Sequence, residues 1–256
     1  MLETVIVTGA SRGIGAATAR ALATPTRHLV LLSRSEGPLQ ERVAEIQALG
    51  GHASYMSVDL SNPEDVVRTV GALLEAHAHI AGLVSCAGYA HTADFLSATM
   101  SDAHYEMRLN YECPLLLVRG LLPRLLEAPR GFVVAVASLT AIVPFPGHAT
   151  YSASKGALVG LMRSLNAEYQ HSNVHFGAVL PGYTETQMTQ HLTSVLPTMT
   201  PEEVADSVLE NIQTSQVISI PGGLNKLAAV VFQLSPSLSH LMLRYVGHHL
   251  VPTVTP

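Results

Sequence analysis

The glycine-rich stretch close to the N-terminus constrains the fold of this chain more than any other feature. Residues 2–8 form a short apolar, β-branched run that predicts a buried strand, and Gly9, Gly13 and Gly15 follow it directly. An alanine-rich segment that predicts a helix continues to about residue 23. Glycines between a strand and a helix let the backbone approach a pyrophosphate at the positive end of the helix. This order of elements favours a dinucleotide site over a plain tight turn, although the spacing is Gly-x-x-x-Gly-x-Gly.

Strands and helices alternate regularly along the rest of the chain. Further strands are predicted at 28–33, 53–58, 80–85, 132–137, 174–180 and 216–220, and helices at 38–49, from 61, at 101–127, at 151–169 and from 200. This alternation predicts an α/β fold, in which a doubly wound, mainly parallel sheet of seven strands carries helices on both faces. Ligands of such a sheet bind beyond the carboxyl ends of the strands, which is where the chain has Gly9, Asp59, Gly88, Ser138 and Pro181.

The composition narrows the range of functions. At 256 residues the chain fits one domain, and its net charge of −5 without a basic block argues against nucleic acid as a partner. The N-terminus lacks the basic region of a signal peptide, and no apolar run reaches the roughly 18 residues of a membrane span. The two cysteines, Cys86 and Cys113, suit a reducing compartment and are interpreted as small buried hydrophobic residues. We therefore expect a cytoplasmic protein.

The 13 histidines raise the question of a metal site. His77 and His79 lie two positions apart near a predicted helix end, and His248 and His249 are adjacent. Neither pair belongs to the Cys/His/Asp spacing of a closed zinc site. Surface histidines are the better interpretation, so no metal is expected.

The residues after the second strand indicate which dinucleotide would bind. A site for NAD usually ends this strand with Asp or Glu, which bonds the ribose hydroxyls, whereas this chain has Ser33 and Arg34. A guanidinium pairs with a 2′-phosphate that a carboxylate would repel, and Arg12 in the glycine loop is a second candidate. Two arginines without a carboxylate predict NADP(H), and the alternative is a pair of solvated surface arginines.

Tyr151 and Lys155 stand four residues apart at the start of a helical run rich in small residues. One helical turn separates them, so both side chains lie on the same face. A free phenol ionises near pH ~10, which is too high for proton exchange at neutral pH. An ammonium one turn away would favour the phenolate and lower that pKa toward the working range. Taken alone, such a pair more often shares a surface without any chemistry.

In combination, these motifs resemble those of the short-chain dehydrogenase/reductase family over residues 2–222. The resemblance lies in Thr8-Gly9-x-x-x-Gly13-x-Gly15, Asp59, Ala87-Gly88, Asn110, Ser138, Tyr151-x-x-x-Lys155, and Pro181-Gly182 with Thr186. Each motif is weak alone, and their common order on the expected elements makes the resemblance specific. One departure is Ser85-Cys86, where the family usually has two asparagines, so one hydrogen bond supporting the central strand is in doubt. The resemblance implies a Rossmann domain over residues 1–223 that binds the dinucleotide and carries the catalytic groups.

The resemblance also implies roles for individual residues. Tyr151 would be the general acid and base at the substrate oxygen, with Lys155 lowering its pKa and holding the nicotinamide ribose. Ser138 would orient the substrate oxygen, and Asn110 would help to position a water in a proton relay with Lys155. The residues expected to contact the dinucleotide are Gly9, Ser11, Arg12, Gly13, Ile14, Gly15, Ser33, Arg34, Asp59, Leu60, Ala87, Gly88, Tyr151, Lys155, Pro181, Gly182, Thr184 and Thr186.

The segments expected to meet the substrate contribute Tyr89, Leu139, His148, Tyr183 and Met188. They are mostly apolar or aromatic, which favours an apolar or long-chain carbonyl compound over a sugar phosphate. His148 lies three residues before Tyr151 in a loop that should line the pocket. Contact with the substrate and simple filling of the loop are equally supported for this histidine.

Residues 224–256 form an apolar extension of the same domain, beyond the basic family pattern. The pattern predicts two amphipathic helices over 224–250, interrupted at Pro236. They would cover the mouth of the pocket, form a subunit interface or lie at a membrane surface. Membrane contact is the least favoured of the three, because few basic residues are available for lipid headgroups.

The leading interpretation is an NADP(H)-dependent oxidoreductase that transfers a hydride reversibly between the nicotinamide and a carbonyl or secondary alcohol group. A non-catalytic NADP(H)-binding sensor or scaffold is the alternative, and its signature would be the loss of Tyr151 or Lys155, both of which are present. A dehydratase or epimerase is a third interpretation, but such relatives usually add a C-terminal substrate domain for which little length remains. The resemblance also implies a homodimer or homotetramer.

Overall fold

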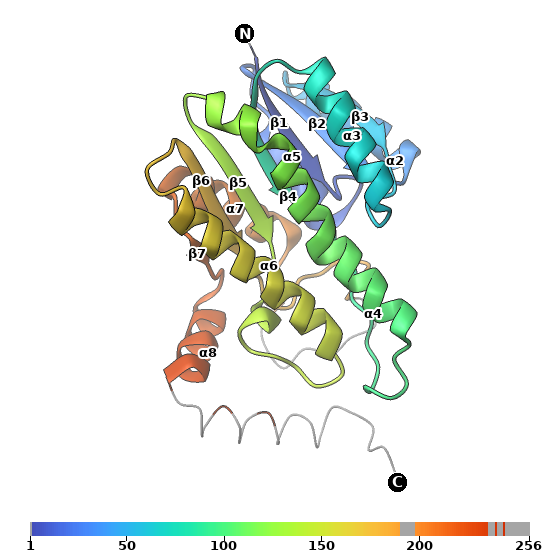
Figure 1. The fold of residues 1–256 in the computed structure, drawn as a ribbon, viewed down its shortest axis with the longest axis vertical. Helices are drawn as coiled ribbons and strands as arrows, with labels where there is room; N and C mark the ends of the chain where they lie inside the picture. Colours follow the sequence, from blue (N-terminus) through green and yellow to red (C-terminus); the bar gives the residue numbers. More distant parts are fainter. Residues whose placement is uncertain (1, 190–197, 235–238, 240–242, 244–256) are drawn as a thin grey trace.

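The chain folds around a seven-stranded sheet with the strand order β3-β2-β1-β4-β5-β6-β7 (Figure 1). The computed structural model describes residues 2–189, 198–234, 239 and 243. The strands are β1 (Glu3–Thr8), β2 (Arg27–Ser33), β3 (His52–Ser57), β4 (Ile80–Ser85), β5 (Gly131–Val136), β6 (Val174–Val179) and β7 (Ile218–Ser219). Each described pair of neighbours is parallel, and the strand order reverses between β1 and β4. The predicted doubly wound α/β Rossmann fold is confirmed.

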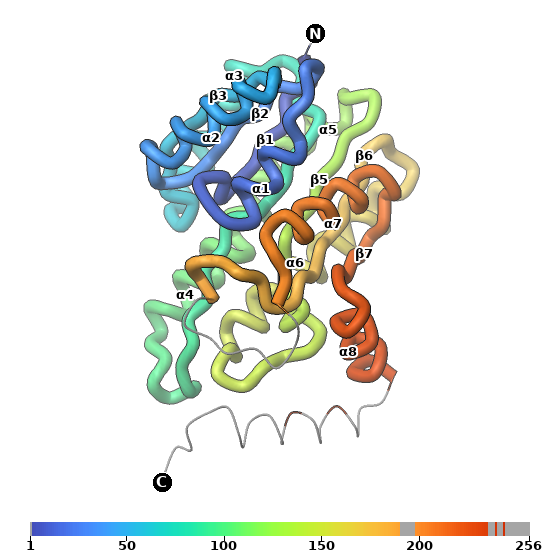
Figure 2. The backbone as a smooth tube through the Cα atoms, turned by 180° about the vertical axis from the view of Figure 1, so that it is seen from behind, coloured from blue at the N-terminus to red at the C-terminus, as the bar shows by residue number. Residues whose placement is uncertain are grey.

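Helices cover both faces of the sheet. The face toward the viewer in Figure 1 carries α3 (Pro63–Ala76), α5 (Cys113–Glu127) and α6 (Ala149–Glu168). The opposite face, toward the viewer in Figure 2, carries α1 (Gly13–Leu22), α2 (Glu36–Ala48) and α7 (Pro201–Thr214). Successive strand residues point to opposite faces, so Ile6 packs in the first core while Val5 and Val7 pack in the second. This burial on both sides explains why the strands are continuous apolar runs.

The long helix predicted over 101–127 is interrupted. It consists of α4 (Met100–Met107), a π-helical turn η1 (Arg108–Glu112) and then α5. Pro114 provides the physical reason, because it has no backbone N–H to donate to the carbonyl of Asn110 four residues earlier. The N–H of Cys113 bonds the carbonyl of Arg108 instead, which widens the turn. Asn110 therefore sits in an irregular turn and is fully buried.

Helix starts predicted from capping residues agree with the structure. Asn62 caps α3 by accepting a hydrogen bond from the N–H of Glu64 at 3.0 Å. Thr200 and Glu203 form the predicted capping box of α7. Among the boundaries that differ from the prediction, α2 begins earlier, at Glu36, α6 begins earlier, at Ala149, and β7 covers only 2 residues.

The C-terminal extension begins with helix α8 (Gly223–Leu234). Asn225 and Ala229 are its buried residues, whereas its exposed apolar residues are Leu224, Leu227, Val230 and Leu234. The first predicted amphipathic helix is therefore present, and the second lies outside the described residues. None of the helices in the described part of the chain is long and apolar enough to span a membrane.

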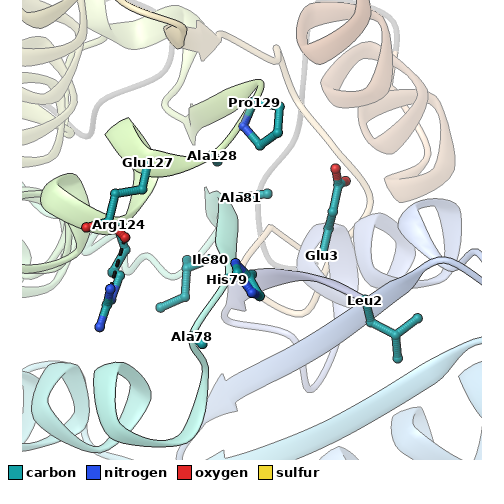
Figure 3. Close-up of a pocket in the computed structure, with 10 residues that line it drawn as sticks. All are labelled: Leu2, Glu3, Ala78, His79, Ile80, Ala81, Arg124, Glu127, Ala128 and Pro129. Carbon is teal, nitrogen blue, oxygen red and sulfur yellow. Dashed lines mark hydrogen bonds and ion pairs between the residues drawn. The ribbon is translucent and has the colours of Figure 1, made fainter.

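The amino ends of the strands form the edge opposite the predicted site. A hollow of about 230 Å³ lies there between the starts of β1 and β4 and the end of α5, with Arg124 and Glu127 on its wall (Figure 3). At the start of β2, His28 Nε2 is 2.8 Å from Ser54 Oγ, and the His28 ring lies 5.4 Å from that of His77. Burial lowers the pKa of His28, and the charges of His77 and His52 lower it further.

We predict that His28 makes the fold sensitive to acid. Its pKa is lowered by folding, so below the ordinary value of 6.5 the unfolded chain binds the proton more readily. The contribution of His28 to stability is fully present above that value and is lost as the pH falls toward the folded pKa. His28→Gln should therefore reduce the fall in the free energy of unfolding between about pH 7 and about pH 5 in urea titrations. The exposed His171→Gln is the control, and equal slopes for wild type and His28→Gln would contradict this account.

Candidate active site

Helix α6 carries Tyr151 in its first turn and Lys155 one turn later. Lys155 is only 4% exposed, and its Nζ donates a hydrogen bond to the carbonyl of Val136, the last residue of β5, at 3.0 Å. The same Nζ lies 5.9 Å from the centroid of the Tyr151 ring. A buried amine held by a strand carbonyl thus brings both side chains to the carboxyl end of β5, where ligands of doubly wound sheets bind.

Ser138 follows β5 and faces Tyr151. Its Oγ accepts hydrogen bonds from the N–H of Thr140 at 3.2 Å and from Thr140 Oγ1 at 2.9 Å. Because both bonds are donated to Ser138, its own hydroxyl proton is directed elsewhere. Ser138 hydrogen-bonds the phenol of Tyr151 and favours the phenolate. The serine and the tyrosine singled out in the sequence therefore meet in space.

Asn110 reaches the same region from the π-helical turn. Its Nδ2 donates to the carbonyl of Tyr89 at 2.8 Å and to Ser154 Oγ at 2.9 Å, and its Oδ1 accepts from the N–H of Tyr89 at 2.9 Å. A Cβ added to Gly88 would lie 3.2 Å from both Asn110 Oδ1 and Lys155 Nζ. Asn110 and Lys155 thus flank Gly88, and protein partners already occupy both Nδ2 hydrogens of Asn110.

Burial dominates the titration of Tyr151 and Lys155. It raises the pKa of Tyr151 to about 12, opposed by the hydrogen bond from Ser138 and reinforced by the charge of Glu106. It lowers the pKa of Lys155 to about 8, and the electrostatic interaction with Cys86 opposes that change. Desolvation favours the neutral form of both groups, and the lowering of the phenol pKa by Lys155 stays a prediction. The phenol is protonated at neutral pH.

The glycine loop packs tightly against the end of β4. Gly9 has a φ of 66°, and a Cβ there would lie 2.8 Å from the backbone nitrogen of Ala87. A Cβ on Gly15 would lie 2.2 Å from the carbonyl oxygen of Gly9. Only glycine fits these two positions, and α1 begins next to them without a side-chain cap on its N–H groups. The loop is therefore a narrow backbone cradle beside a free helix N-terminus.

The departure from the family pattern at Cys86 does not leave the central strand unsupported. Thr8 Oγ1 accepts hydrogen bonds from the N–H groups of Cys86 and Ala87, both at 3.1 Å. Cys86 Sγ lies 4.0 Å from Thr18 Oγ1. Burial raises the pKa of the Cys86 and Cys113 thiols to about 12, which fits their interpretation as unreactive hydrophobic residues.

Arg34 and Asp59 lie at the adenosine end of the predicted site. Arg34 Nη1 donates to Tyr105 Oη at 3.0 Å. Asp59 Oδ1 accepts from Ser61 Oγ at 2.7 Å and from the N–H of Ser61 at 3.0 Å. Burial alone would raise the pKa of Asp59, but the bonds from Ser61 and the charge of Arg34 hold it below its usual range. The structure thus brings the predicted arginine and aspartate within electrostatic reach of each other.

Arg12 points toward the segment after β6 rather than toward Arg34. It donates a hydrogen bond to Gln187 Oε1. A Cβ on Gly13 would lie 3.4 Å from Thr186 Cγ2, so the same segment touches the glycine loop. Arg34 and Arg12 are both predicted to bind the 2′-phosphate. The Arg12 side chain bonds Gln187 instead of lying beside Arg34.

The turn after β6 is anchored from two sides. The carbonyl of Pro181 accepts from the N–H of Leu139 at 2.8 Å, and Thr184 Oγ1 donates to the carbonyl of Gly182 at 3.2 Å. Asn225 of α8 packs under Gly182, where a Cβ would lie 2.6 Å from Asn225 Nδ2. Asn225 Oδ1 is buried without a partner in the described part of the chain. The extension therefore contacts the predicted nicotinamide end directly.

The other predicted dinucleotide contacts are less exposed. The Leu60 side chain packs in the first core, and Ile14 packs against the second. Ser33 is buried, and its Oγ accepts from the N–H of Ser35 at 3.2 Å. Ser11 lies half-buried in the glycine loop. For Leu60 and Ser33, contact with a ligand would have to use backbone atoms.

Of the predicted substrate residues, His148 lies beside the phenol, and the others differ in their contacts and exposure. The His148 ring lies 6.0 Å from that of Tyr151, and its Nδ1 is buried without a described partner. Tyr89 packs edge-on to Tyr105 at 5.0 Å, and Leu139 is 6% exposed in a 3₁₀ turn (η2, Leu139–Ala141). Tyr183 Oη donates to the carbonyl of Thr189, and Met188 is 42% exposed.

Sequence reasoning missed several residues of the site. Glu106 and Thr150 hydrogen-bond each other beside Tyr151, Tyr105 holds Arg34, and Asn225 supports Gly182. A charged residue in a helix usually indicates a solvent-exposed face. The residues next to Glu106 in the sequence therefore do not predict that it is buried. In the part of the chain that the structure describes, no three His, Cys, Asp or Glu side chains gather in a way that could hold a metal ion.

We predict that Gly9→Ala disrupts the cradle. Its left-handed backbone costs alanine about 1–2 kcal/mol, and the added Cβ would meet the fixed backbone of Ala87. Gly160 lies within α6, and a Cβ added to it would meet no atom within 4 Å, so Gly160→Ala is the matched control and should stabilise the fold by about 0.5–1 kcal/mol. Urea unfolding of both variants measures the difference, and a Gly9→Ala protein as stable as Gly160→Ala would show that the cradle is loose.

Comparison with known proteins agrees with this geometry. Residues 3–196 match the family described as short chain dehydrogenase. A ketoacyl reductase, HetN, of a Nostoc species is 30% identical, over 96% of this chain and 89% of that protein. A fatty acyl-CoA reductase of Acinetobacter baylyi is 26% identical, over 99% of this chain and 86% of that protein.

Two solved structures share the fold. A short-chain dehydrogenase from Sphingobium yanoikuyae in complex with NADPH superposes with a TM-score of 0.81 at 27% identity, covering 100% of this chain and 98% of that one. A metagenomic short-chain oxidoreductase in complex with NADP has a TM-score of 0.74 at 31% identity, covering 85% of this chain and 94% of that one. The sheet order, the glycine cradle and the family match together show that the chain belongs to the short-chain dehydrogenase/reductase family of oxidoreductases.

Proposed function

We propose that this chain is an NADP(H)-dependent oxidoreductase that transfers a hydride reversibly between the nicotinamide and a carbonyl or secondary alcohol group of an apolar substrate. The observation that carries the proposal is the meeting of Tyr151, Lys155 and Ser138 at the carboxyl end of β5. Three polar side chains that converge beside a glycine cradle are suited to acid–base chemistry on a single oxygen atom.

NADP(H) fits the residues present. Gly9 and Gly15 have no Cβ, and a Cβ at either position would clash with the backbone. Their absence of side chains allows a pyrophosphate to approach the N-terminus of α1, which has no side-chain cap. Arg34 would pair with the 2′-phosphate, since the residue directly after β2 is this arginine and not an acidic residue that would repel the phosphate. The two neighbouring structures described above contain NADP or NADPH, which supports the same choice here.

Each side chain of the site would then have its own role in the reaction. The bound nicotinamide supplies or accepts the hydride. Tyr151 donates its proton to the carbonyl oxygen during reduction and takes a proton from the alcohol during oxidation, and its raised pKa keeps it ready to donate at neutral pH. Ser138 donates a hydrogen bond to the same oxygen and stabilises the charge that develops there.

Lys155 and Asn110 would support the transfer. Lys155 lies beneath the phenol and would bond the nicotinamide ribose hydroxyls. Asn110 fixes the backbone of Tyr89 through two hydrogen bonds, and its Oδ1 retains a lone pair for a water that returns a proton from solvent. After reduction the phenolate regains its proton along this route, which balances the reaction.

The substrate that we assign is an apolar or acyl carbonyl compound. Among the predicted substrate residues, the His148 ring lies beside the Tyr151 ring, and the set as a whole is mostly apolar or aromatic: Tyr89, Leu139, His148, Tyr183 and Met188. The relatives named as a ketoacyl reductase and a fatty acyl-CoA reductase support an acyl chain. We also propose a cytoplasmic homodimer or homotetramer, in which residues 224–256 extend the domain at 1–223.

A non-catalytic sensor is less well supported than an enzyme. A sensor has no need of the acid–base pair, yet Tyr151, Lys155 and Ser138 are all present and brought together. NADPH fluorescence separates the two functions, because a sensor would bind NADPH without oxidising it in the presence of a panel of ketones, aldehydes and acyl thioesters.

We predict that Tyr151→Phe abolishes turnover while NADPH still binds. The variant keeps the ring but loses the proton donor, which should lower kcat by at least about 100-fold. Tyr169→Phe, at the far end of the same helix, is the matched control and should keep full activity. Steady-state rates and NADPH fluorescence titrations give both readouts, and turnover retained in Tyr151→Phe would refute the proposed role.

We predict that Arg34→Asp shifts preference from NADPH to NADH. A charge-assisted bond to the 2′-phosphate is lost and a repulsion replaces it, so the ratio of kcat/KM values should fall roughly 10- to 100-fold. Arg68→Asp makes the same charge change at an exposed position on α3 and should leave the ratio alone. If Arg34→Asp also leaves it unchanged, the assignment of Arg34 is wrong.

A further inference from the structure

Glu106 is a fully buried carboxylic acid for which the chemistry above has no use. It lies on α4, four residues before Asn110, and 0% of its surface is exposed. None of the ion pairs among the described residues includes it. Burying a carboxylate without a cation is strongly unfavourable, so its presence beside the site calls for a function.

Both oxygens of Glu106 accept hydrogen bonds from segments that line the site. Oε1 accepts from the N–H of His91, in the loop after β4, at 2.7 Å. Oε2 accepts from Oγ1 of Thr150, the residue directly before Tyr151. Each oxygen of the buried carboxyl group thus has one hydrogen-bond partner. Glu106 therefore ties the loop that carries Tyr89 to the turn that carries Tyr151.

The groups that face Tyr151 come from several elements. Lys155 approaches from the same helix, and His148 from the loop before it, with ring centroids 6.0 Å apart. Glu106 acts from α4, and Cys86 at the end of β4 acts on Lys155. Burial is the main cause that raises the pKa of Tyr151, and Glu106 adds to it. Burial lowers the pKa of His148, and Glu106 opposes that change.

We propose that Glu106 is a positioning residue of this site, which holds the first turn of α6 against the loop after β4 and places a negative charge that keeps Tyr151 protonated. The inference rests on the proposed function, in which the phenol donates and accepts the proton. A nearby negative charge opposes formation of the phenolate, so it fixes the pH at which Tyr151 becomes a base. Glu106 acts through its hydrogen bonds to His91 and Thr150 and through its charge on Tyr151.

Glu106→Gln separates the charge from the hydrogen bonds. The glutamine Oε1 can accept from the N–H of His91 while its Nε2 donates to Thr150 Oγ1, because a hydroxyl both donates and accepts. Oxidation of an alcohol requires the phenolate, so kcat/KM for oxidation rises with pH until Tyr151 is ionised. Because the pKa of Tyr151 is raised to about 12, the readout is the rising limb of this profile below about pH 10; the limb, and the break that ends it, should move down by about one pH unit when the charge is removed.

The measurement uses the full chain with NADP⁺ and the best secondary alcohol of a panel, for wild type, Glu106→Gln and Thr150→Ser. Thr150→Ser keeps the hydroxyl and the charge, so its break should stay at the wild-type pH. A purely structural role for Glu106 would lower the rate and leave the break where it is. Should Glu106→Gln fail to fold, Glu106→Met removes the same charge with a side chain suited to burial, and the same criteria apply.

Two outcomes would overturn the inference. One is an unmoved break in the folded variant that lacks the charge. The other is an equal shift in Thr150→Ser, because the break would then report the packing of α6 rather than the carboxylate. If Tyr151→Phe loses turnover while the break does not move, the role of Glu106 alone is rejected. If Tyr151→Phe retains turnover, the proposed function itself fails.

Discussion

The hydrogen bond from Lys155 Nζ to the carbonyl of Val136 joins the chemistry of this protein to its fold. The amine is almost fully buried, so the bond forms in a low-dielectric setting where it is strong and where its loss would leave a polar group unpaired. It fixes α6 against the end of β5. Tyr151, one turn earlier, is thereby held over the same strand end that places Ser138. Without this bond the buried amine would lack its partner at the strand end that also places Ser138.

The rest of the site repeats this arrangement, in which each polar side chain bonds a neighbouring element. Asn110 joins the π-helical turn to the loop after β4, and Glu106 joins α4 to both that loop and α6. Thr8 joins β1 to the end of β4. Such a network is unfavourable unless every member is satisfied, and satisfied it specifies one geometry. Burial raises the pKa of Tyr151, so its phenol stays protonated and is suited to donating a proton.

Much of the fold follows from local sequence signals. The glycines at positions 9 and 15 predict the tight loop after β1, and Asn62 and Thr200 predict where two helices begin. Backbone freedom and helix capping both act over a few residues, so the local sequence is enough to predict them. The alternation of apolar runs was enough to predict the doubly wound sheet. The Tyr151–Lys155 spacing also predicts a shared helix face, but it does not predict that burial raises the pKa of the phenol.

Features that depend on distant contacts could not be predicted. Pro114 is the local cause of the π-helical turn, yet the burial of Asn110 within it depends on Tyr89 and Ser154. Nothing near Glu106 in the sequence marks it as buried, because its partners lie on other segments. The pairing of Arg34 with Tyr105 is equally non-local. Sequence patterns predict which face of a helix or strand is buried and where the element ends. The contacts of Asn110, Glu106 and Arg34 form only when separate elements pack together.

A crystal structure of the complex with NADP⁺ tests the central claim most directly. We expect Lys155 Nζ within hydrogen-bonding distance of the nicotinamide ribose hydroxyls while it keeps its bond to Val136. The Tyr151 and Ser138 hydroxyls should then point to one space beside nicotinamide C4. A dinucleotide bound away from the carboxyl ends of β1, β4 and β5, or a Tyr151 ring turned away from the nicotinamide, would contradict the account.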